Sequence, residues 1–461
     1  MRRDTGDTAV GQARNGRALR QLRRVALLSA LIVAGCSGGG EPERENLTNP
    51  SGIAANRAPL SAIFRGAKFA AVAADESRAA EIGRDVLAGG GNATDAAVAM
   101  YFAMAVTLPS AASLGASGVC IAHDSKTRVG EAFVFAPVAA PGGVRGVQIT
   151  VPSGVRAVTL MHARHGSVPW PAVVAPGERL ARLGVPVSRA LSRDLQAAAT
   201  ALGADSEARR IFGRGGGTAV TEGDNFIQTD LAATLGIIRQ RGGGDFFSGS
   251  LARVISDQVA QIGGSLPMES LRNAVPQYGP PAGESYGGFR VYVAPAPMAG
   301  AQALAGWRGE AGPSGAVPTD SGGIAGLAAI DTSGGAAACS LSMGQLFGAR
   351  VMVPNTGILL GTPTADSTAV SPLVFGNPGN GEALFAGAGG GGAAAAYATG
   401  FIARGTVRDK QYVAAALRAH GGRGGWVNAI ACPDGVRGGG ASCNSGNDPA
   451  GGGLALNATV R

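Results

Sequence analysis

The side chains best able to bind a metal ion or move a proton are four histidines, His123, His162, His165 and His420. A protein metal site takes several His, Cys, Asp or Glu ligands, often at short and regular spacings. None of the four histidines lies near a cysteine or a carboxylate at such a spacing. The sequence therefore predicts no metal and no cofactor.

A short apolar run near the start of the chain is typical of a signal peptide. Arg23 and Arg24 precede the segment VALLSALIVAG at residues 25–35. Positive charge, an apolar stretch and small residues before a cleavage site are the parts of such a peptide. A helix needs about 20 apolar residues to span a bilayer, so this run is too short to do so. We therefore expect the protein to be exported.

Cys36 follows this run directly, and the segment LIVAGC resembles a bacterial lipobox. In that motif the cysteine carries the lipid and becomes the first mature residue. The alternative is an ordinary secretory signal in which Cys36 occurs by chance. We interpret residues 1–36 as a lipoprotein signal peptide and residues 37–66 as a flexible tether. The lipid would anchor the protein to the membrane of the bacterial cell envelope, facing the periplasm.

Four further cysteines would lie in an oxidising compartment after export. Cys432 and Cys443 flank a Gly-rich segment, so a local disulfide between them is expected. Cys120 and Cys339 lie in apolar runs that are typical of strands, where they would pack as buried thiols. The sequence leaves the disulfide pairing of the four cysteines open.

The composition indicates a globular protein and gives no sign of nucleic-acid binding. Hydrophobic residues make up 45% of 461 residues, enough to bury a core. The net charge is +8, but many basic residues precede position 25 and the others are scattered among acids. Aromatic residues are only 5% and do not alternate with basic ones, unlike the surfaces that bind nucleic acids. We predict no nucleic-acid partner.

The first part of the chain alternates between predicted strands and helices. The apolar segment KFAAVAA predicts a strand, and Asp75 is a suitable N-cap for a helix that runs to Leu87. A second helix, from Asn92 to Leu108, is apolar on nearly all sides and is therefore expected inside a core, with Pro109 stopping it. The segments VCIAHD and EAFVFAP predict a pair of strands.

The remainder divides into a helical part and a second group of strands. Residues 151–275 show the 3.6-residue period of helices, and GFRVYVAPAP predicts a strand. Residues 308–323 are rich in Gly, Pro and Ser and are interpreted as a surface linker. After it, IAGLAAID, GAAACSLSM and ALFAGA predict strands, and AAAAYATGFIARG and VAAALRAHG predict helices. Strands at both ends with helices between them favour an α+β layered fold.

Six segments follow one another along the chain: VLAGGGNATDAAVAMYFAMAVTLPSAASLG, VPSGVRAVTLMHARHGSVPWPAVVAPGERLARLGVPV, TDLAATLGIIRQRGGGDFFSGSLARVISDQVAQIGG, YGGFRVYVAPAPMAG, LFGARVMVPNTGILL and the terminal ACPDG…SCNSGNDPAGGGLA. Taken in this order, they resemble the γ-glutamyltransferase (γ-glutamyltranspeptidase) family, in a proteobacterial branch. The resemblance implies an N-terminal nucleophile hydrolase fold, a four-layer αββα sandwich. In that sandwich residues 67–307 would correspond to the large subunit, 308–323 to the linker and 324–461 to the small subunit. Residues 67–461 would form one domain.

The resemblance also implies a chemistry. Members of this family cut themselves before a threonine, whose free amine then acts as base and whose hydroxyl attacks the γ-glutamyl group, usually of glutathione. Aligning IAGLAAIDTSGGAAACSLSMGQLFG with the family pattern TTHxSVVDxxGNAVxxTxTxNxxFG places Ile324 at the nucleophile. Isoleucine has no hydroxyl, so it cannot attack a carbonyl or drive self-cleavage.

Other family positions are partly lost and partly kept. The arginine that holds the substrate carboxylate falls among residues 136–138, none of which is cationic, and the small-subunit asparagine becomes Gly344. Ser342 matches a second threonine beside the nucleophile, and Asp366 matches an acid that holds the substrate amine. Thr368 matches the first residue of a Ser-Ser pair. In the segment AGAGGGG, Gly389 and Gly390 match the loop whose N–H groups stabilise the oxyanion.

These observations leave three hypotheses. The first is a degenerate family member, an envelope lipoprotein without turnover that keeps the fold to bind a γ-glutamyl or glutathione-like compound or to serve as a scaffold. The second is an active hydrolase or transferase that uses a displaced hydroxyl such as Ser321, which lies three residues before Ile324 in a flexible Gly-rich stretch. The third is a decaying gene without a selected role.

Overall fold

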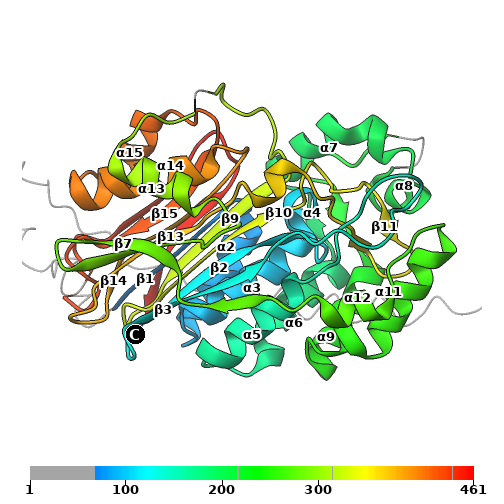
Figure 1. The fold of residues 1–461 in the computed structure, drawn as a ribbon, viewed down its shortest axis with the longest axis horizontal. Coiled ribbons are helices and arrows are strands. Elements are labelled where there is room, and N and C mark those ends of the chain that lie inside the picture. Colours follow the sequence, from blue (N-terminus) through cyan, green and yellow to red (C-terminus); the bar gives the residue numbers. More distant parts are fainter. Residues whose placement is uncertain (1–67, 215–217, 314, 439, 461) are drawn as a thin grey trace, which may run out of the picture. The chain divides into compact units, whose positions relative to one another are not determined.

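The computed structural model describes residues 68–460, except residues 215–217, 314 and 439. The predicted signal peptide, the lipidated Cys36 and the tether at residues 37–66 lie outside the described residues. Two large sheets dominate the described part (Figure 1). One has the strand order β17-β1-β9-β10-β2-β3-β6, and the other has the order β16-β15-β14-β13-β8-β7.

All neighbouring strands in both sheets are antiparallel. The first sheet contains β1 (Lys68–Ala74), β2 (Ser117–Asp124), β3 (Val129–Phe135), β6 (Gln277–Gly279), β9 (Ile324–Ile330), β10 (Ala336–Ser342) and β17 (Leu454–Val460). The second contains β7 (Ala282–Tyr286), β8 (Phe289–Val293), β13 (Leu373–Gly376), β14 (Ala383–Gly390), β15 (Trp426–Ala431) and β16 (Asn444–Asn447). Two short pairs lie outside these sheets, β4 (Val185–Pro186) with β5 (Asn225–Phe226) and β11 (Met352–Val353) with β12 (Ile358–Leu359).

Alternating side chains of the first sheet serve two separate cores. Along β9, Ile324 and Ala328 belong to the core between the two sheets. Ala325 and Leu327 belong to the core beneath the helices. Both faces of β9 are therefore buried, which explains why its sequence is a continuous apolar run rather than an alternating one.

Helices cover the outer face of each sheet. The helices are α2 (Ser77–Ala88), α3 (Ala93–Thr107), α4 (Pro109–Ala112), α5 (Gly154–His165), α6 (Trp170–Leu183), α7 (Arg189–Leu202), α8 (Ser206–Phe212), α9 (Thr229–Arg241), α10 (Asp245–Ser248), α11 (Ser250–Gln261), α12 (Met268–Asn273), α13 (Gly300–Arg308), α14 (Ala395–Ala403) and α15 (Val413–His420). The first sheet contacts α2, α3 and α5, and the second contacts α13, α14 and α15 (Figure 1). The four layers follow the order αββα, which confirms the predicted α+β sandwich.

The helix that was expected inside a core is buried along its whole length. Every residue of α3 is buried, and Asn92 caps it by accepting a hydrogen bond from the N–H of Asp95. Pro109 ends α3 and also begins the short α4. The prediction that Asp75 caps α2 is wrong, because Glu76 is the cap and accepts the N–H of Ala79 at 2.8 Å.

The cysteines form two disulfides in the described part of the chain. Cys432 is bonded to Cys443, as predicted. Cys120 and Cys339 are also bonded to each other, so they are not the two buried thiols that the sequence allowed. They stand directly opposite each other on β2 and β10, with their Cα atoms 4.0 Å apart. The antiparallel pairing of these strands, which joins residues far apart in sequence, brings the two sulfur atoms together.

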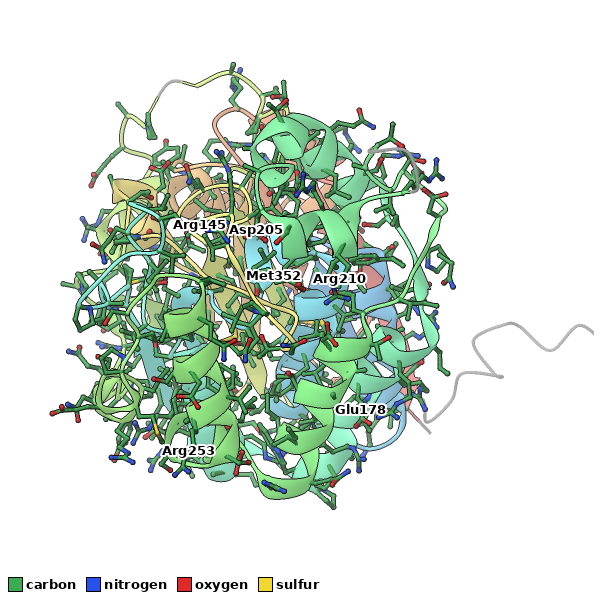
Figure 2. The ribbon with its side chains drawn as sticks, turned by 90° about the vertical axis from the view of Figure 1, so that its right-hand side faces the viewer. Arg145, Glu178, Asp205, Arg210, Arg253 and Met352 are labelled. Carbon is green, nitrogen blue, oxygen red and sulfur yellow. A yellow bond between two sulfur atoms is a disulfide. The ribbon has the colours of Figure 1, made fainter. Side chains whose placement is uncertain are left out.

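Figure 2 shows the side of the molecule that lies on the right in Figure 1, and charged side chains cover its surface. Arg145 and Asp205 lie side by side there, with Arg145 Nη1 3.2 Å from Asp205 Oδ2. Asp205 also caps α8, since it accepts the N–H of Ala208 at 2.8 Å. The carboxylate thus ties the loop that carries Arg145 to the helical layer. Within the described residues, no helix is both long enough and apolar enough to cross a membrane.

Candidate functional site

Ile324, the residue aligned with the family nucleophile, is the first residue of β9 and is fully buried. It stands directly opposite Ser342 on β10. Its N–H donates to the carbonyl of Ser321 at 2.9 Å, and its carbonyl accepts the N–H of Gly391 at 3.4 Å. Its side chain fills part of the core between the sheets. This position offers a hydrocarbon to its surroundings and no group that can form a bond to a carbonyl carbon.

Gly389 and Gly390 end a strand, so the expectation that they form a loop is wrong. They pair with Val427 and Trp426 of β15, and the turn starts only after them. A Cβ atom on Gly390 would lie 2.3 Å from Asp75 Oδ2 and 2.8 Å from the carbonyl oxygen of Ile324. The absence of a side chain at Gly390 therefore allows the end of β14 to approach both Asp75, which follows β1, and the start of β9 closely.

Ser321 is buried and held by a carboxylate, contrary to the expectation of a flexible stretch. Its hydroxyl donates to Asp194 Oδ2 at 2.6 Å and its N–H donates to Asp194 Oδ1 at 3.0 Å. The hydroxyl of Ser110 donates to the same Asp194 Oδ2, also at 2.6 Å. Gly322 and Gly323, with φ of 57° and 76°, then turn the chain into β9. The entry to β9 is thus fixed by Asp194 on α7.

The Asp194 carboxylate is completely shielded from solvent, with no exposed side-chain area. Burial raises the pKa of the Asp194 carboxyl above its usual range, because a charged carboxylate is poorly solvated there. Hydrogen bonds from Ser110 and Ser321 and the charge of Arg193 act in the opposite direction. The Nε atom of Arg193 lies 3.4 Å from Asp194 Oδ1. The Asp194 carboxylate therefore has hydrogen-bond partners within the protein and is not exposed to a ligand.

The remaining predicted residues lie near Ser342 but differ in accessibility. The buried hydroxyl of Ser342 accepts the N–H of Gly344 at 3.0 Å and donates to the backbone carbonyl of Asp366 at 3.4 Å. Asp366 is exposed, and its contact with Ser342 is made by its backbone and not by its carboxylate. Thr368 is half-buried and donates to the carbonyl of Ala365 at 3.3 Å. Ile324, Ser342 and the backbone of Asp366 therefore come together.

Asp75 belongs to this region, although sequence reasoning assigned it to a helix cap. It is buried between the sheets, where its Oδ2 accepts the N–H of Gly326 at 2.7 Å and its Oδ1 accepts Asn428 Nδ2 at 2.6 Å. Burial raises the pKa of Asp75 to about 7. The sequence did contain a signal against Asp75 as the cap, because the adjacent Glu76 is a second carboxylate that can cap α2.

The Asp75→Asn variant is expected to remove part of the pH dependence of stability. Because the folded-state pKa of about 7 exceeds the ordinary value of 3.8, the folded protein binds more protons between these values. Asp75 therefore contributes full stability below about pH 4, and this contribution falls by on the order of 1 kcal/mol per pH unit up to about pH 7. Urea unfolding from pH 4 to 8 measures the difference between the variant and the wild type.

Relative to the wild type, the unfolding free energy of Asp75→Asn should increase as the pH rises to about 7, and the difference should then become constant. Asp85→Asn, which removes an exposed carboxylate from α2, is the control. A difference between Asp75→Asn and the wild type that stays constant from pH 4 to 8 would contradict the assignment.

The linker between α13 and β9 lies against the glycine end of β14. The N–H of Gly424 donates to the carbonyl of Ala316 at 2.9 Å. A Cβ atom on Gly392 would meet Pro318 Cγ at 4.0 Å, and one on Gly322 would meet the Cα of Gly392 at 3.7 Å. Residues 316–322 of the connection between α13 and β9 (Figure 1) therefore lie against the turn that follows Gly390. Within the described ranges, no group of three or more His, Cys, Asp or Glu residues is arranged to hold a metal ion.

The sequence of the helical half matches a known family. The model of the Gamma-glutamyltranspeptidase family matches residues 79–308. These residues place the chain in the γ-glutamyltranspeptidase family. The family match covers the large-subunit-like region and stops before β9, so it does not reach Ile324.

Two relatives of the γ-glutamyltranspeptidase family show how much of the chain is shared. The glutathione hydrolase proenzyme of Bacillus subtilis (strain 168) is 30% identical over 249 residues, which are 50% of this chain and 42% of that protein. The glutathione hydrolase proenzyme of Escherichia coli (strain K12) is 30% identical over 252 residues, 51% of this chain and 43% of that protein. The matched region therefore spans less than half the length of these relatives.

A solved structure covers nearly the whole sandwich. The cephalosporin acylase from Bacillus halodurans superposes with a TM-score of 0.68 at 20% identity, covering 85% of this chain and 96% of that one. At this level of identity the similarity concerns the fold alone. It confirms the predicted α+β sandwich fold.

Proposed function

We propose that the protein is an exported, lipid-anchored member of a proteobacterial branch of the γ-glutamyltranspeptidase family that has lost self-cleavage and turnover. In this proposal it remains one uncut chain at the periplasmic side of the cell envelope. It keeps the family fold to bind a γ-glutamyl or glutathione-like compound or to serve as a scaffold, without cleaving a substrate. The observation that carries the proposal is the buried hydrocarbon side chain of Ile324 at the first position of β9.

The surroundings of Ile324 support this loss. The opposite hydroxyl, that of Ser342, is buried and engaged with the N–H of Gly344 and the carbonyl of Asp366. The N–H of Gly391 faces the carbonyl of Ile324 itself. The groups that a nucleophile would need beside it are therefore bound to the protein's own backbone.

The positions aligned with the family's substrate-binding residues also support a loss of turnover. Ala136, Pro137 and Val138, which follow β3, carry no charge that could hold a carboxylate. Losing an arginine fork removes the strong bidentate hydrogen bonds that such a clamp supplies. The ligand class is supported by the relatives, which are named glutathione hydrolase proenzymes.

One observation favours the alternative of an active enzyme. Ser321 donates to the buried carboxylate of Asp194 at 2.6 Å, and a serine beside a basic group is a common activated nucleophile. Cleavage between Asp320 and Ser321 would then give Ser321 a free amine. Against this, the Ser321–Asp194–Ser110 network also explains how the start of β9 is held, which requires no catalysis.

The two functions differ in a simple experiment on the full-length protein. We expect the wild type to run as one band on a denaturing gel and to release no p-nitroaniline from γ-glutamyl-p-nitroanilide, because position 324 has no hydroxyl. Amino-terminal sequencing of any fragment locates a cut. The Ser321→Ala variant is the matched control for the alternative nucleophile.

A new amino terminus at residues 321–324, or chromophore release that Ser321→Ala abolishes, would overturn the proposal. The Ile324→Thr variant restores a hydroxyl to the aligned position. A cut directly before residue 324 in that variant would establish the alignment independently of the substrate.

A further inference from the structure

The helical layer contains an apolar groove of about 520 Å³ that is remote in sequence from the residues around Ile324. It lies where α5, α10, α12 and the start of β6 meet. Its apolar lining includes Leu160, Ala163, Phe247, Val275, Pro276 and Tyr278. We call this feature the apolar groove.

Two large side chains of the apolar groove are left in solvent. Val275 is 61% exposed and Tyr278 is 55% exposed. Single exposed apolar residues are common, but a concave group of them is typical of a binding site. The volume falls within the usual range for small-molecule pockets, roughly 300–1,000 Å³.

The charged residues of the apolar groove are all positive. Arg156 and Arg272 line it, and none of its lining residues is acidic. Neither arginine forms an ion pair with a carboxylate of residues 68–213 or 218–460. The nearby Arg164, in contrast, is paired with Glu131 at 2.6 Å.

The arginines are positioned by contacts that leave their charge uncompensated. Arg156 Nη1 donates to the backbone carbonyl of Arg272 at 2.7 Å, and its guanidinium carbon lies 5.5 Å from the centre of the Phe247 ring. The contact with Arg272 uses only its backbone, so the Arg272 side chain remains available. A guanidinium beside an apolar surface binds a carboxylate strongly because its N–H fork matches the two oxygens.

We propose that the apolar groove binds a monocarboxylic acid with an unbranched aliphatic chain. The chain lies on Leu160, Phe247 and Val275, and the carboxylate meets the guanidinium groups of Arg156 and Arg272. The absence of lining acids favours an anion over a cation. The apolar floor favours an aliphatic tail over a wholly polar anion such as phosphate.

Isothermal titration of the full-length protein with hexanoate, octanoate and decanoate tests the aliphatic part. Affinity should rise roughly fourfold for each additional buried methylene until the chain fills the groove. Octanol and decanol, which have the same chains without the charge, test the head group and should bind at least tenfold more weakly than the acids. Equal affinity of acid and alcohol would overturn the proposal, as would the absence of any measurable binding of decanoate.

Variants locate the site. Arg272→Gln keeps the backbone contact to Arg156 and should weaken decanoate at least tenfold while leaving decanol unchanged. Val275→Asp, at an exposed position, should weaken both compounds. Arg253→Gln, which removes an exposed arginine of α11 outside the groove (Figure 2), is the control and should change neither.

Unchanged decanoate affinity in both Arg272→Gln and Val275→Asp would place the binding elsewhere and overturn the assignment. A glutamate-rich peptide that binds while decanoate does not would assign the groove to an acidic protein segment, which also overturns it. Circular dichroism of each variant shows whether its fold is retained.

Discussion

Replacing Cys120 and Cys339 together with alanine is expected to lower the free energy of unfolding by about 5 kcal/mol. Their disulfide joins β2 to β10 across a sequence separation of 219 residues. A cross-link over so long a loop removes much of the conformational entropy of the unfolded chain, and this entropy returns when the bond is deleted. Guanidinium unfolding of the oxidised wild type and of the double variant measures the effect.

The second disulfide provides the matched comparison. Cys432 and Cys443 are separated by only 11 residues, so replacing both with alanine should cost about 3 kcal/mol by the same argument. If the Cys432/Cys443 variant were less stable than the Cys120/Cys339 variant, loop entropy would not be the main contribution of the bond between β2 and β10.

The Asp194→Ala variant should lose about 4 kcal/mol of unfolding free energy. Alanine would leave the buried hydroxyls of Ser110 and Ser321 and the N–H of Ser321 without their acceptor. It would also leave Arg193 without its carboxylate partner. Because this network holds the turn before β9, the loss should be accompanied by easier proteolysis near Gly322. Urea unfolding and limited proteolysis measure the two effects.

Smaller changes at the same network separate its parts. Ser110→Ala and Ser321→Ala each remove one hydrogen bond to Asp194 and should cost about 1 kcal/mol. Asp194→Asn keeps the shape of the side chain and should lie between these values and the alanine variant. A loss below about 1 kcal/mol in Asp194→Ala would show that the network is not a structural support.

The elements with a strong local pattern could be predicted from the sequence. The apolar residues on every side of α3 indicated a helix enclosed by other elements, and all its residues are buried. The runs that became β1, β2, β3, β9 and β10 are rich in small and β-branched apolar residues bounded by turns. In these segments the local preference and the final environment agree, since both faces of the sheet are covered.

The features that depend on pairing between distant segments could not be predicted. The disulfide between Cys120 and Cys339 follows from the register of β10 on β2, which no local pattern specifies. The edge strand β16 has the sequence NSGN, which lacks the apolar character of a strand. It forms because its backbone completes the hydrogen bonds of β15.

In the candidate site, too, some residues could be predicted from the sequence and others could not. Alignment with the family pattern identified Ile324 and Ser342, and the structure places them directly opposite each other. The roles of Asp75 and Asp194 were missed because each acts on a residue far away in the sequence. Asp75 accepts from Gly326 and Asn428, and Asp194 accepts from Ser321. A single sequence contains no periodicity from which such contacts can be inferred.

The position of β1 within its sheet has a consequence for biosynthesis. This strand is flanked by β9, which begins at Ile324, and by β17, which begins at Leu454. While the chain is being synthesised, β1 has two open edges, and the edge that pairs with β17 closes only when residues 454–460 are available. Open edges of this kind invite pairing with other chains. Holdase chaperones that shield such edges should therefore associate with the unfolded chain until β17 has paired with β1.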